Sequence, residues 1–159
     1  MALKDAYSGL QIGLHWATAA LIGANYLISD GMEQAFDAKM EGASYGGLVP
    51  SFHVWAGSAL LAIVLVRLVI RLMSGAPAKA GQTFATQVSG LVHWVLYALM
   101  IAVPALGVGA WFLGIDQAAG LHVLAMNTMM ILILGHAGMA IFRHYVLRDG
   151  LLSKMTPLR

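Results

Sequence analysis

Four long stretches of predominantly apolar residues, separated by polar segments, dominate the chain. They run from about 10 to 29, 51 to 73, 88 to 114 and 119 to 147. About 20 helical residues span a hydrocarbon core, and backbone groups in lipid must find their hydrogen bonds within the helix. The pattern therefore predicts an all-α fold, a four-helix transmembrane bundle that makes residues 1–159 a single membrane domain.

The polar segments between these stretches carry most of the turn-forming residues. Residues 30–50 and 74–87 contain several glycines and prolines and are expected to be loops. The connection at 115–118 is so short that the third and fourth helices should be antiparallel neighbours. Pro104 is expected to kink the third helix without ending it, since apolar sequence continues on both sides.

Basic residues are distributed unequally between the two predicted sides of the membrane. One side has eight of them, namely Lys4, Arg67, Arg71, Lys79, Arg143, Arg148, Lys154 and Arg159. The other side has only Lys39, within a segment that also carries Asp30, Glu33, Asp37 and Glu41. The positive-inside rule therefore predicts cytoplasmic N and C termini in a multi-pass membrane protein.

Composition excludes several other classes of protein. The chain is 60% apolar and 10% charged, whereas soluble domains have about 25% charged residues. Its basic pI of about 9.1 follows from the membrane charge asymmetry and requires no nucleic-acid partner. There is no cysteine, which excludes disulfides, thioether-linked haem and cysteine-bound iron–sulfur clusters. The N-terminal residues lack a signal-peptide pattern, so the first apolar stretch should remain as a membrane helix.

Histidines inside the apolar stretches are the candidate functional residues, because ionisable groups are rare within membranes. His53 and His122 begin the second and fourth stretches on the outer side, while His15 and His93 lie on the cytoplasmic side. His136 follows His122 by 14 residues, roughly 21 Å along the same helix face. Depth therefore pairs His53 with His122, and it pairs His136 with either His15 or His93.

Facing histidines from different helices of a bundle are suited to the axial ligation of haem iron, here two b-type haems. A single buried histidine is more often a hydrogen-bonded structural residue, but four at matched depths argue against that interpretation. Nearby glycines, such as Gly57, Gly120 and Gly135, give room for a macrocycle or simply for close helix packing. A transition-metal transporter is a weaker alternative, since the spans carry no aspartate or glutamate.

Several segments together resemble the bacterial dihaem cytochrome b561 family, a domain also found in b-type subunits of nickel–iron hydrogenases. They include YSGLQIGLHW at 7–16, HVWAG at 53–57, HWVLY at 93–97 and HAGMA at 136–140. The resemblance covers nearly the whole chain and implies a multi-pass protein of the bacterial inner membrane.

This resemblance implies a specific set of ligands. His15 and His136 would bind the inner haem iron, and His53 and His122 the outer one. His93 would then lie near the inner haem without binding its iron.

The resemblance also implies a function in electron transfer. Members of the family pass electrons across the membrane and exchange them with ubiquinone, and some are taken to oxidise superoxide at the outer side. Arg71, Arg143 and His144 would then contact the quinone or the haem propionates, although membrane anchoring explains arginines at this surface equally well.

The outer donor is a separate question, because the segment before His53 is acidic. Superoxide is an anion, and a negative rim slows its encounter. A periplasmic redox protein with a basic face therefore competes with superoxide as the electron donor. Another alternative is a haem b anchor or electron-conduit subunit of a dehydrogenase or hydrogenase, which would require a partner redox subunit.

Overall fold

The computed structural model describes residues 7–74, 84–150 and 152–155, and all regular structure in these ranges is helical. Lys4, Lys79 and Arg159, which contribute to the charge asymmetry, lie outside the described residues, as does the side chain of Lys154. The elements in chain order are α1 (Gly9–Leu27), α2 (Met32–Met40), α3 (Leu48–Ser74), α4 (Phe84–Leu113), α5 (Asp116–Tyr145) and the 3₁₀ helix η1 (Leu152–Met155).

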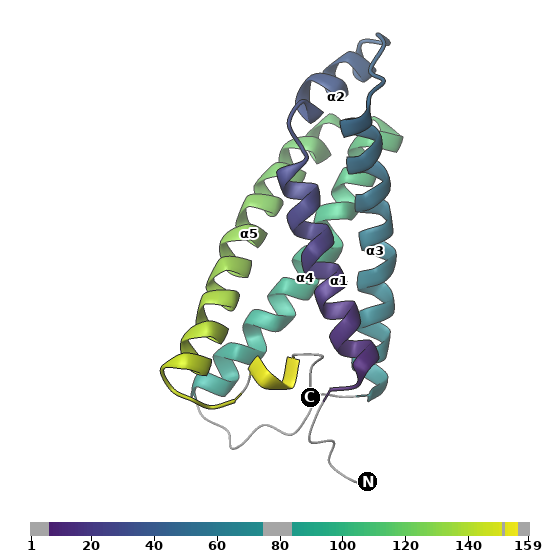
Figure 1. The fold of residues 1–159 in the computed structure, drawn as a ribbon. Coiled ribbons are helices and arrows are strands. Elements are labelled where there is room, and N and C mark those ends of the chain that lie inside the picture. The colour runs from purple at the N-terminus through teal and green to yellow at the C-terminus, as the bar shows by residue number, and fades with distance from the viewer. Residues whose placement is uncertain (1–6, 75–83, 151, 156–159) are drawn as a thin grey trace.

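The four long helices lie side by side as a bundle, and the short helix α2 covers one end of it (Figure 1). Helix α4 packs against α5 and α3, and α1 packs against α3. We call the end covered by α2 the acidic end, because it carries Asp30, Glu33, Asp37 and Glu41. The opposite end, where α1 begins and α5 finishes, is the basic end, with Arg71, Arg143 and Arg148.

The prediction of four transmembrane spans is wrong. Among the described residues, three helices are long and apolar enough to cross a membrane: Leu48–Met73, Thr86–Leu113 and Asp116–Tyr145. Only 11%, 22% and 11% of the residues in their most apolar stretches are buried inside the protein, so most of these residues keep some surface that is available to lipid. Helix α1 is not among these spans, because Gln11, His15 and Asn25 interrupt its apolar sequence.

Helix α2 is a second departure, because a loop was expected over residues 30–50. The helix follows Gly31, whose φ of 86° is a left-handed conformation that favours glycine. Glu33 lies in its first turn and Lys39 in its last, so each charge opposes the helix dipole at its own end. The positions of these two charges in the sequence therefore indicated a helix over residues 32–40.

Helices α4 and α5 form a hairpin with only two residues between them, Gly114 and Ile115. Gly114 has φ of 66°, which a residue with a side chain rarely adopts. Pro104 lies inside α4, which continues on both sides of it. The hairpin thus places the start of α5 directly beside the end of α4.

The buried core lies midway along the bundle, where α1, α3, α4 and α5 meet. Val64 is completely buried and Met129 is 2% exposed. Thr18 of α1 is also buried, and its hydroxyl donates a hydrogen bond to the Leu14 carbonyl. This intrahelical bond allows a polar residue to be buried without an unpaired hydroxyl. The core separates the histidines near the acidic end from those nearer the basic end.

Candidate haem-binding histidines

His53 of α3 and His122 of α5 face each other near the acidic end. Their ring centroids are 6.1 Å apart and their ring planes are inclined at 73°. Two imidazoles bound to opposite sides of one metal ion, at metal–nitrogen distances of about 2 Å, have centroids roughly 6 Å apart. The spacing of this pair therefore fits axial ligation of a single iron ion.

The ring of His122 is held by the neighbouring helix α4. Its Nδ1 lies 2.7 Å from the carbonyl oxygen of Val103, and since a carbonyl can only accept, Nδ1 carries the proton. The lone pair of Nε2 is then free for a metal, the tautomer that ligating histidines normally have. Gly107, one turn after Val103, leaves the room for this approach, because a Cβ there would lie 3.2 Å from the ring.

A similar arrangement surrounds His53 on α3. Gly57 lies one turn further along, and Asn25 of α1 approaches it, with Nδ2 3.4 Å from where a Cβ of residue 57 would be. The same Nδ2 donates a hydrogen bond of 3.4 Å to the carbonyl of His53. Nδ1 of His53 and Oδ1 of Asn25 are both buried and have no hydrogen-bond partner within the described part of the chain.

Three other histidines gather on the side of the core nearer the basic end. His93 of α4 and His136 of α5 have ring centroids 5.0 Å apart, with planes inclined at 88°. His15 of α1 is close enough to both for their charges to interact with it. The His93 Nδ1 donates a hydrogen bond to the carbonyl of Ser89 in its own helix.

His15 differs from these residues because an arginine faces its ring. Nη2 of Arg67 lies 2.8 Å from Nδ1 of His15, and the guanidinium also lies over the Tyr97 ring, 5.6 Å from its centroid. An arginine can only donate, so Nδ1 of the neutral ring accepts and Nε2 carries the proton. Iron binding through Nε2 of His15 therefore requires the Arg67 side chain to leave Nδ1.

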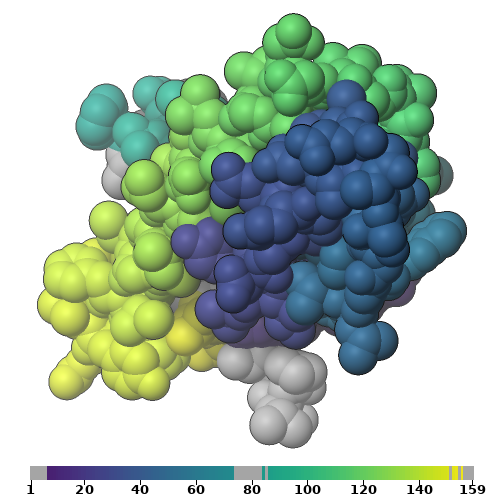
Figure 2. Space-filling view, turned by 90° about the horizontal axis from the view of Figure 1, so that it is seen from above, coloured from purple at the N-terminus to yellow at the C-terminus, as the bar shows by residue number. Residues whose placement is uncertain are grey.

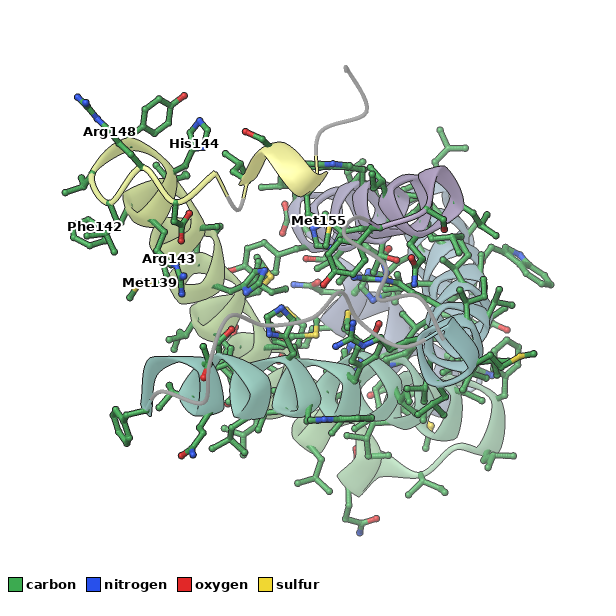
Figure 3. The ribbon with its side chains drawn as sticks, turned by 90° about the horizontal axis from the view of Figure 1, so that it is seen from below. Met139, Phe142, Arg143, His144, Arg148 and Met155 are labelled. Carbon is green, nitrogen blue, oxygen red and sulfur yellow. The ribbon has the colours of Figure 1, made fainter. Side chains whose placement is uncertain are left out.

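His144 and the arginines predicted to contact a quinone lie at the basic end. Nδ1 of His144 is buried without a hydrogen-bond partner among the described residues. Arg143 makes an ion pair with Asp149, the Nε–Oδ2 distance being 2.5 Å, and Arg71 is half-buried in the last turn of α3. In Figure 3, Arg148 points away from the bundle.

The C-terminal helix η1 links this end of α5 to α1. The Trp16 indole donates a hydrogen bond of 2.8 Å to the carbonyl of Met155. Figure 3 shows Met155 beside α1, on the opposite side of the basic end from Phe142. Helix η1 therefore contacts α5 and is attached to α1 by the bond from Trp16.

At the acidic end, α2 and the segment after it lie across the face of the molecule (Figure 2). An open hollow of about 490 Å³ lies between α2 and the start of α3, with Asp30 and Gln34 in its lining. Nζ of Lys39 lies over the rings of Tyr45 and Trp111, at 5.3 and 5.7 Å from their centroids. These cation–π contacts hold the ammonium group over aromatic rings.

The structure thus brings together some predicted residues and adds others. It places His53 against His122, and it places His136 against His93 with His15 nearby. Sequence reasoning missed the roles of Asn25, Arg67 and Val103, which contact histidines from other helices. Asn25 and Arg67 are polar residues in apolar surroundings and were visible in the sequence, whereas the Val103 carbonyl carries no side-chain signal. Within the described ranges, no three or more His, Asp or Glu side chains group as a metal site.

Comparison with known proteins gives one family. The model of the family described as prokaryotic cytochrome b561 matches residues 6–158. Cytochrome b562 of Cereibacter sphaeroides is 43% identical over 155 residues, which cover 98% of each chain. Probable superoxide oxidase CybB of Yersinia pestis is 29% identical over 179 residues, and cytochrome b561 homolog 1 of Escherichia coli is 28% identical over 178, each alignment covering at least 98% of both chains. No solved structure matches.

Proposed function

The chain belongs to the prokaryotic cytochrome b561 family of membrane haem b electron-transfer proteins, and we propose that it binds two b-type haems and transfers electrons between a periplasmic donor and ubiquinone. His53 and His122 are the proposed axial ligands near the acidic end, and His15 and His136 those on the basic side of the core. A bound haem supplies the one-electron redox chemistry, while the chain supplies ligation, orientation and burial.

The observation that carries this proposal is the geometry of His53 and His122. Their centroids are 6.1 Å apart, and the Val103 carbonyl fixes His122 as the tautomer that presents a free Nε2. Two helices thus supply opposed nitrogen ligands at one depth, and a third orients one of the rings. A hydrogen-bonded Nδ1 also makes a ligating imidazole more basic.

The second ligand pair rests on the grouping of His15, His93 and His136. The family resemblance favours His15 with His136, and the Arg67 guanidinium that contacts His15 would supply positive charge for an anionic propionate. His93 is the competing ligand, because its ring is in contact with that of His136. Separate substitutions of His15 and His93 distinguish the two pairs.

The acidic end is the proposed site of the electron donor, and the positive-inside rule supports a periplasmic position for it, because the basic residues lie at the opposite end. One relative is named a probable superoxide oxidase, which supports superoxide as a donor. Charge supports a cationic redox protein instead, since residues 30–41 at the acidic end carry four carboxylates and their one lysine, Lys39, is held over two aromatic rings. Both donors deliver one electron at a time.

Ubiquinone is the proposed acceptor at the basic end. His144 has a buried Nδ1 that is free to hydrogen-bond a quinone oxygen or carry its proton. Arg71 and Arg143 add positive charge there, although Arg143 is already paired with Asp149. A quinone contact by Arg143 therefore requires this ion pair to open or to be shared.

The proposal is tested by a reduced-minus-oxidised visible spectrum of the detergent-purified protein, with haem quantified per chain. Two low-spin b haems per chain are expected, and His53→Ala and His136→Ala should each remove one of them. His144→Ala is the matched control, because it removes a buried imidazole without removing a proposed ligand. A colourless protein from haem-sufficient cells, or two haems retained in both ligand variants, would overturn the proposal.

A further inference from the structure

Two buried polar atoms without hydrogen-bond partners belong to residues that are in contact near the acidic end. Nδ1 of His53 and Oδ1 of Asn25 are both buried without partners, and their residues are already joined by the hydrogen bond from Asn25 Nδ2 to the His53 carbonyl. An unsatisfied buried polar atom costs about 1–3 kcal/mol, so such atoms are rarely left without a partner. Nδ1 of His53 can donate a hydrogen bond when it carries the proton, whereas Oδ1 of Asn25 can only accept one.

The protonation that iron binding requires makes the two atoms complementary. A histidine that binds a metal through Nε2 carries its proton on Nδ1 and normally donates it to an oxygen acceptor. His122 meets this requirement with the carbonyl of Val103. Nδ1 of His53 has no such hydrogen bond among the described residues, although the Asn25 backbone lies close to the ring, and the amide oxygen of Asn25 also has no partner.

The local packing places Asn25 for this role. Gly57, one turn after His53 on α3, allows the Asn25 amide to approach, just as Gly107, one turn after Val103, allows His122 to approach α4. In both places a glycine on one helix gives a polar side chain of another helix access to the backbone four residues earlier.

We propose that Asn25 is the positioning residue of His53: its Oδ1 accepts the Nδ1 proton of His53, directly or through one water molecule, and so fixes the orientation and basicity of that ligand. This inference rests on the proposed haem ligation by His53. It gives α1 a defined part in the site near the acidic end, although α1 supplies neither of the two ligands there.

Two substitutions of Asn25 should shift the midpoint potential of the haem bound by His53 in opposite directions. Asn25→Leu removes the acceptor, so His53 becomes less basic and the midpoint potential of its haem should rise. Asn25→Asp keeps an acceptor and makes it stronger, so the potential should fall. A tenfold change in the ratio of reduced to oxidised haem corresponds to about 59 mV for one electron, and a shift of at least this size is expected in each variant.

Potentials are measured by optical redox titration of the haem-loaded protein, following the spectral component that His53→Ala removes. The low-spin ferric electron paramagnetic resonance signal of that component gives a second readout, because its g values depend on the basicity of the axial ligands. Asn127→Leu on the exposed face of α5 is the matched control and should change neither quantity.

Failure of this inference differs from failure of the proposed function. If His53→Ala retains both haems, ligation by His53 is wrong. If His53→Ala loses one haem but the two Asn25 variants shift its potential in the same direction, or not at all, ligation stands and the role of Asn25 is refuted. If Asn25→Leu gives no folded protein, the electron paramagnetic resonance signal of Asn25→Asp is the deciding measurement. A signal identical to that of the wild type would refute the inference.

Discussion

Gly107 is the residue whose substitution tests the site near the acidic end most directly. Alanine in place of a glycine inside a helix normally stabilises it by roughly 0.5–1 kcal/mol. At position 107, however, the added Cβ would lie 3.2 Å from Cε1 and Nδ1 of His122, closer than the optimal contact of about 3.5–4.0 Å. The ring must therefore move away from α4, which strains its bond to the Val103 carbonyl.

The expected cost can be estimated from these contacts. Overpacking of a well-packed site costs about 1–3 kcal/mol, which exceeds the gain in helix propensity. A net loss of about 1.4 kcal/mol corresponds to a tenfold change in an equilibrium constant. Gly107→Ala should therefore retain the haem of His53 and His122 roughly tenfold more weakly, while the other haem is unaffected.

Gly109 provides the matched control on the same helix. An alanine Cβ there would lie 3.7 Å from Cβ of Ala118 and 4.0 Å from Cδ1 of Ile115, which are ordinary contacts. Gly109→Ala should thus keep both haems and be neutral or slightly stabilising. The two variants are compared by diluting each protein and measuring the haem that remains bound per chain from its reduced-minus-oxidised spectrum. Equal haem retention in both would refute the reasoning.

Three further predictions concern the remaining residues. His144→Ala should slow quinone reduction several-fold and leave the haem spectrum intact; unchanged quinone kinetics in a stopped-flow assay would exclude a quinone contact. His15→Ala should remove the same spectral component as His136→Ala, while His93→Ala keeps it, and the reverse result would make His93 the ligand. Replacing both Glu33 and Asp37 with lysine should slow reduction by a cationic donor protein about tenfold at low salt and speed reduction by superoxide. Equal rates for the wild type and this double variant would show that α2 does not steer the donor.

The sequence was informative where a residue's own chemistry carried the signal. Depth along the apolar stretches predicted that His53 and His122 occur at one level, and the structure has their rings facing each other. Their role as haem ligands stays a prediction, as does the choice between His15 and His93. Family membership, which the motifs indicated, is confirmed by the match over residues 6–158.

The sequence was less informative where neighbours in space decide the outcome. The count of four spans was wrong because apolar length was given more weight than the polar positions within α1, such as Asn25. The bonds from Asn25 to His53, from Arg67 to His15 and from Trp16 to Met155 each join residues at least 28 positions apart. Such contacts depend on which helix faces meet, and hydrophobic periodicity in a nearly uniformly apolar helix does not specify this.

The two-residue connection between α4 and α5 also has a consequence for how the protein is made. Val103 and His122 are only 19 positions apart on the two sides of this hairpin, so their bond closes a short loop at low entropic cost. His53 must reach the same place from a helix 69 positions earlier than His122. One half of the binding site is therefore assembled locally as the hairpin forms, and the other half is added when α3 docks. Cofactor capture would then stabilise the docked arrangement, so haem supply during synthesis should determine how much of the newly made protein completes its fold.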